Sequence, residues 1–181
     1  MKNEDLLPWF IGGGVVVGAI AMLTDTGQNA VNYVKATAQT ALTTRTPQDI
    51  LDAVAKIDPE HNPDLQPGAN GGADWCNRFL YLVLKELGVY MPINTLANAE
   101  IEFMASSSDW TQLSQDDALA AALQGQVVVA TYYNPGGHGH VALVLPIDGP
   151  MQIAQAGAST FNRGTLAHGF GSLPVAFYAH A

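Results

Sequence analysis

The sequence predicts an α+β domain in which helices pack on a small antiparallel sheet, preceded by a hydrophobic N-terminal helix. Three observations carry this prediction. Apolar residues recur at helical spacing from about residue 46 to 124, β-branched runs joined by short turns follow residue 126, and residues 6–23 carry no charge. With 181 residues, 48% of them hydrophobic, the chain is long enough for one domain and an additional anchor.

Charge and cysteine content exclude several classes of function. The chain has 7 Lys and Arg against 16 Asp and Glu, a formal net charge of −9. Because no basic surface is available to neutralise phosphates, we expect no nucleic-acid partner. The single cysteine, Cys76, excludes an internal disulfide and any all-cysteine metal site, and we expect neither a metal nor an organic cofactor.

Residues 6–23 are anchor-like. As a helix they would span about 27 Å, slightly less than the ~30 Å hydrocarbon core of a bilayer. Gly14 and Gly18 form a small-xxx-small pair that lets another helix approach closely. Two interpretations stay open: a segment inserted in a membrane, or a helix that is buried or packed inside an assembly of several chains. We place residues 1–44 in this anchor and stalk and residues 45–181 in the folded domain.

The remaining elements follow from caps and turns. Thr46 is the expected N-cap of the first helix of the domain, with Asp49 at the capping-box position, and Ser114 caps a later helix. Strands are expected wherever β-branched and aromatic runs lie between Gly-, Pro- or Asn-rich turns. We expect helices at about 46–57, 76–87, 95–105 and 114–124, and strands at 126–133, 138–146, 151–157 and 173–180.

Cys76 falls in the first turn of a strongly apolar helix, directly after a Gly-rich loop. The exposed N–H groups and the positive dipole end of a helix stabilise a thiolate there. A side chain at such a loop-to-helix junction faces a cleft, while the rest of its helix is anchored in the core. A lone cysteine is otherwise most often a small buried hydrophobic residue, and that alternative stays open.

Two histidines are candidate bases for this thiol. His140 begins the second expected strand, and His138, two residues earlier, would point to the same face of that strand. Imidazole titrates near neutral pH, so either ring could accept a thiol proton and return it to a leaving amine. A third polar group must orient the ring; Gln155, at the end of the third strand, is the candidate, with Gln152 and Asn134 as alternatives.

The segments DWCNRFLYLVLKELGVYMP, WTQL and ALQGQVVVATYYNPGGHGHVALVLP together resemble the NlpC-type and CHAP-type papain-like cell-wall hydrolases. They are particularly similar to the peptidoglycan amidases delivered by type VI secretion. The resemblance covers about residues 69–157. It implies a papain-like fold, with Cys76 as nucleophile, His140 as general base and Gln155 as the third residue. Trp75 and Asn77, which depart from the commoner D-C-S-G pattern, and His138 are the candidate substrate-binding residues.

The expected function is therefore cleavage of amide bonds in cell-wall peptides by a cysteine amidase or endopeptidase. We expect it to be membrane-anchored or virion-associated and to act in the periplasm or cell wall. Its partners would be peptidoglycan and, through residues 6–23, a membrane or other chains. One alternative is a structural component of a phage or secretion assembly whose hydrolase-like domain only binds cell wall. Another is an acyltransferase or lipid hydrolase on the same scaffold.

Overall fold

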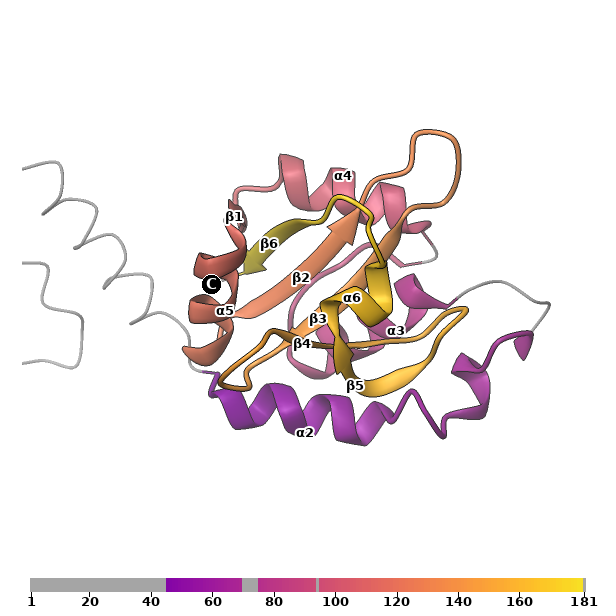
Figure 1. The fold of residues 1–181 in the computed structure, drawn as a ribbon, viewed down its shortest axis with the longest axis horizontal. Coiled ribbons are helices and arrows are strands. Elements are labelled where there is room, and N and C mark those ends of the chain that lie inside the picture. The colour runs from indigo at the N-terminus through magenta and orange to yellow at the C-terminus, as the bar shows by residue number, and fades with distance from the viewer. Residues whose placement is uncertain (1–44, 70–74, 94, 181) are drawn as a thin grey trace, which may run out of the picture. The chain divides into compact units, whose positions relative to one another are not determined.

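A six-stranded, wholly antiparallel sheet organises the domain (Figure 1). The structure is a computed structural model that describes residues 45–69, 75–93 and 95–180; the expected N-terminal helix lies outside the described residues. The strand order is β1-β6-β2-β3-β4-β5. The strands are β1 (Trp110–Leu113), β2 (Val127–Tyr132), β3 (His140–Leu145), β4 (Gln152–Gln155), β5 (Phe161–Thr165) and β6 (Ala176–His180).

Helices cover both faces of this sheet, with α3 on one face and α5 and α6 on the other (Figure 1). On β2, Val127 and Val129 join a core with α2, α3 and α4, whereas Val128 and Ala130 join a second core with α5 and α6. A strand buried on both faces needs a continuous apolar run, which explains why this segment does not alternate. The helices are α2 (Pro47–Ile57), the 3₁₀ turn η1 (Pro63–Leu65), α3 (Cys76–Glu86), α4 (Ala97–Ser106), α5 (Gln115–Leu123) and α6 (Leu166–Phe170).

The expected α+β class is confirmed, and so are the four helices and four strands predicted from caps and turns. The capping box of α2 is formed: the Thr46 N–H donates to Asp49 Oδ2 at 2.7 Å, and the Asp49 N–H donates back to the Thr46 hydroxyl. The Ser114 hydroxyl accepts from the Asp117 N–H and so caps α5. None of the helices in the described ranges has the length and apolar character that crossing a bilayer requires.

Besides the 3₁₀ turn η1, three short elements are not predicted by the sequence pattern: β1, β5 and α6. β1 has only four residues and pairs with β6, some 70 positions along the chain. β5 is an edge strand of mixed polarity that reads as loop, and α6 has five residues, one of them glycine. β1 depends on a contact distant in sequence, whereas β5 and α6 pack on the neighbouring β4 but are too short or too mixed in polarity for a local period to mark them.

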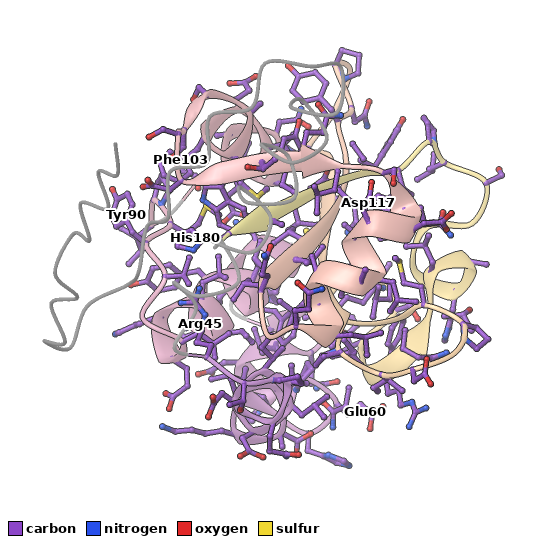
Figure 2. The ribbon with its side chains drawn as sticks, turned by 90° about the vertical axis from the view of Figure 1, so that its left-hand side faces the viewer. Arg45, Glu60, Tyr90, Phe103, Asp117 and His180 are labelled. Atoms are coloured by element: carbon purple, nitrogen blue, oxygen red, sulfur yellow. The ribbon has the colours of Figure 1, made fainter. Side chains whose placement is uncertain are left out.

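The beginning and end of the described domain meet beside the sheet. Figure 2 shows Arg45 and His180 close together; the Arg45 guanidinium lies 3.4 Å from His180 Nδ1 and also donates to the Leu87 carbonyl. Gly125 adopts a φ of +85°, and a Cβ there would collide with the Arg45 carbonyl oxygen. The backbone at Arg45 is therefore tightly packed against the domain.

Candidate active site

A cavity of about 520 Å³ opens at one end of the sheet, where α3 begins, β3 begins and β4 ends. Because neighbouring antiparallel strands run in opposite directions, the first residue of β3 and the last of β4 lie at the same end of the sheet. Cys76, His140 and Gln155, the three residues predicted as nucleophile, base and orienting group, all line this cavity. These three residues are far apart in the sequence, and the fold brings them to the same cavity.

Cys76 is the first residue of α3 and is 5% exposed. The N-cap, Trp75, offers no side-chain hydrogen bond to the helix, and no acidic residue lies in its first turn. The positive end of the helix is therefore not neutralised by its own cap, which favours a negative charge on the sulfur. The apolar face of the helix, with Phe79, Leu80, Val83 and Leu84 fully buried, fixes this end in place.

His140 is held by a hydrogen bond to Gln155, with Nε2 and Oε1 2.8 Å apart. The Gln155 side chain is 2% exposed, and its own Nε2 donates to the Ser159 carbonyl at 2.8 Å. A carbonyl can only accept, so this second bond sets the amide orientation and leaves Oε1 as the acceptor toward the histidine. The neutral His140 ring therefore carries its hydrogen on Nε2 and keeps Nδ1 as the proton acceptor.

The packing around this pair fixes the imidazole ring further. The Phe170 ring lies 4.8 Å from the His140 ring, centroid to centroid. A Cβ at Gly157 would lie 3.9 Å from His140 Cε1, and one at Gly169 would lie 2.5 Å from Gln155 Oε1. Position 169 therefore has no room for a larger residue beside Gln155, whereas a Cβ at position 157 would make an ordinary contact with the ring.

His138 also lines the cavity, but the expectation that it shares a strand face with His140 is wrong. Strand β3 begins at His140, and Gly139 has a φ of +70°, which breaks the strand alternation between the two histidines. His138 is exposed in the preceding loop, and its carbonyl accepts from the N–H of Asn98 at 3.1 Å. The His138 imidazole therefore lies at the rim of the cavity, while its backbone carbonyl helps to hold the loop before β3 against α4.

Asn98, on α4, is a supporting residue that sequence reasoning missed. Its Nδ2 donates to the carbonyls of Asn134 and Gly137, at 2.7 and 3.0 Å, and its Oδ1 accepts from the Asn134 N–H. A Cβ at Gly139 would collide with the Asn98 side chain and lie 2.9 Å from the Tyr132 carbonyl. This amide therefore ties the loop leading into His140 to α4; an asparagine within a helix carries no local signal for a contact 36 positions away.

The two other predicted substrate-binding residues flank Cys76. Asn77 lines the same cavity, and one of its amide hydrogens is donated to the Thr95 carbonyl. Trp75 lines a neighbouring cavity rather than that of Cys76, and its indole N–H donates to the Ala69 carbonyl at 3.1 Å. Asn77 therefore connects the start of α3 to the segment before α4, and it borders both cavities.

Within the described ranges, no group of three or more His, Cys, Asp or Glu side chains is arranged to hold a metal ion. In comparisons with known proteins, neither a family model nor a curated protein matches the chain. The resemblance to papain-like cell-wall hydrolases accordingly remains a prediction that rests on the quoted segments.

Proposed function

We propose that this protein is a thiol hydrolase that cleaves amide bonds of cell-wall peptides. The observation that carries the proposal is the hydrogen bond between His140 and Gln155 in the cavity that Cys76 also lines. A nucleophile, a base with its acceptor nitrogen defined, and a group that orients the base are the three parts that nucleophilic acyl transfer requires. The papain-like fold and the peptide substrate come from the family resemblance.

In the proposed mechanism, His140 takes the Cys76 proton through Nδ1 and the thiolate attacks the amide carbonyl carbon. The bond from Nε2–H to Gln155 then stabilises the positively charged ring. Backbone N–H groups in the first turn of α3, that of Cys76 among them, donate to the oxyanion of the tetrahedral intermediate. His140 returns the proton to the leaving amine, and water, deprotonated by the same ring, hydrolyses the thioester.

We propose further that residues 6–23 tether the enzyme to a membrane or to a particle, so that it opens the wall locally. Residues 1–44 carry none of the proposed site residues. Tethering and hydrolysis are compatible, because the site is built entirely from residues beyond position 75. The competing role, a wall-binding component without activity, predicts binding to peptidoglycan but no release of fragments.

The test is incubation of the protein with purified peptidoglycan, followed by mass analysis of the soluble fragments. We expect new amine and carboxyl ends from the wild type and none from Cys76→Ser. Iodoacetamide at about pH 6.5, where a free thiol is almost fully protonated, should alkylate Cys76 and stop the release. Continued release by Cys76→Ser would refute the nucleophile, and wall binding without any release would favour the structural role.

A further inference from the structure

A second cavity, of about 380 Å³, adjoins the cavity of Cys76. The two share Asn77 and Leu96 as lining residues, so a ligand that extends from the thiol past these side chains would reach it. Aromatic and polar side chains line it: Trp75 at the N-cap of α3, Arg78 and Tyr81 on α3, Thr95 before α4, and Glu100 on α4.

Glu100 is the unusual member of this set. It lies on α4, is 1% exposed, and its Oε2 has no hydrogen-bond partner within the described part of the chain. A buried carboxyl oxygen without a partner is costly, and proteins rarely keep one unless it serves a ligand or a reaction. A hydrophobic residue at this position would continue the apolar face that Ala97, Ile101 and Met104 form on the same helix.

The surroundings of Glu100 would not compensate a negative charge on its carboxyl group. Arg78 and Tyr81, both from α3, are the other titratable side chains among the described residues that line this cavity, and the segment 93–96 contributes none. The Arg78 guanidinium carbon lies 5.6 Å from the centre of the Trp75 ring, and Arg78 forms no ion pair with Glu100. Burial raises the pKa of Glu100 to about 9, so the carboxyl group is neutral near pH 7 when no cation lies beside it.

We propose that this second cavity binds a primary ammonium group of the substrate, with the Glu100 carboxylate as its counter-ion. An ammonium brings a hydrogen-bond donor for Glu100 Oε2 and the positive charge that a carboxylate there requires, and the Tyr81 ring suits the attached methylene groups and the cation, since Arg78 already lies over the Trp75 ring. Binding transfers no covalent group: Glu100 releases its proton to solvent and pairs with the ammonium. The inference rests on the proposed function in taking the ligand to be a cell-wall peptide, whose stem amines are of this class.

The test is calorimetric titration of the full-length chain carrying Cys76→Ala, which prevents turnover. The probes are the tripeptide L-Ala-γ-D-Glu-L-Lys and the same peptide with both amines acetylated. We expect the free peptide to bind at least about tenfold more tightly, a difference of about 1.4 kcal/mol. Titration in buffers of different ionisation enthalpy should show about one proton released per site near pH 7. The two singly acetylated peptides then identify which amine is bound.

Two matched variants assign these effects. Glu100→Gln, of the same shape but without a charge, should abolish both the preference for the free amine and the proton release. Glu102→Gln removes a carboxylate from the exposed side of the same helix, where it accepts from the Tyr133 hydroxyl, and should change neither. Equal affinity for the free and acetylated peptides would overturn the proposal, and so would proton release that persists in Glu100→Gln or no binding of the free peptide at millimolar concentration.

The outcome is separable from that of the proposed function. Release of fragments from peptidoglycan by the wild type, with no preference for free amines, would refute the ammonium site alone. A preference for the free peptide that depends on Glu100, without any release of fragments, would support the ammonium site and refute the hydrolase.

Discussion

The stability of this protein should depend on pH through the buried carboxyl group of Glu100. Burial raises the pKa of this group from 4.5 to about 9 in the folded protein, whereas the unfolded chain exposes it to water. Between these two values the folded state holds a proton that the unfolded state has lost. The free energy of unfolding therefore falls as pH rises: the contribution of this group is complete below about pH 4.5 and is lost progressively toward pH 9.

The size of the effect follows from the separation of the two pKa values. Each pH unit within the window costs about 1.4 kcal/mol, so moving from pH 5 to pH 8 removes about 4 kcal/mol of stability through this one group. Glu100→Gln retains the shape of the side chain and has no proton to lose. The free energy of unfolding of the variant, relative to the wild type, should therefore increase by about 4 kcal/mol over the same interval.

Urea unfolding of the full-length chain in a mild detergent, at constant ionic strength and at steps from pH 5 to pH 8, measures this difference. Glu102→Gln is the control, because its carboxylate is exposed and should leave the pH dependence as it is in the wild type. If the curves of Glu100→Gln and the wild type stay parallel to within about 1 kcal/mol, Glu100 is ionised in the folded protein and the reasoning fails.

Three further predictions concern the site and the N-terminal segment. His140→Ala should slow peptidoglycan hydrolysis by about 10²- to 10⁴-fold and His138→Ala far less; the reverse ranking in the fragment-release assay would assign the base to the loop histidine. Gly169→Ala places a Cβ 2.5 Å from Gln155 Oε1 and should lower the rate at least tenfold (about 1.4 kcal/mol) with an unchanged circular dichroism spectrum. The control Gly136→Ala, whose Cβ would lie 3.8 Å from its nearest neighbour, should not change the rate, and equal rates for the two variants would mean that the Gln155 amide does not position the base. A chain shortened to residues 44–181 should elute from a sizing column as an active monomer without detergent and the full chain should not; an unfolded short chain would place the domain boundary elsewhere.

Local chemistry made most of the fold predictable. Two helix starts are predicted by capping, which needs only neighbouring residues: Thr46 with Asp49 caps one helix, and Ser114 caps another. The β2–β3–β4 meander is visible because its strands are apolar and the turns between them are rich in glycine, proline and asparagine. The same kind of signal, the change from a Gly-rich segment to an apolar helical period, predicts that Cys76 lies at a helix start.

What the sequence could not supply is the set of contacts made between distant segments. The pairing of β1 with β6 brings Trp110 opposite His180, and nothing near either residue encodes the other. The different settings of His138 and His140 depend on the positive φ of Gly139, which a period-two reading of the strand ignores. Glu100 has the spacing of a core residue on α4, but its burial beside a cavity emerges only when α3 and residues such as Ile93 and Thr95 pack around the same cavity.

The same distant contacts explain how a single orientation of the His140 ring is selected. The Asn98 amide holds the loop before the strand, the Gln155 amide bonds to the ring nitrogen, and the Phe170 ring packs against the imidazole. These three constraints come from α4, β4 and α6, so no single element determines the ring. A base that must present one nitrogen to a thiol requires these constraints together, because a ring free to rotate would exchange donor and acceptor positions. Removing the Asn98 amide or the Phe170 ring should therefore reduce the rate while leaving the His140–Gln155 pair in place, whereas removing the Gln155 amide also removes the bond that defines the tautomer.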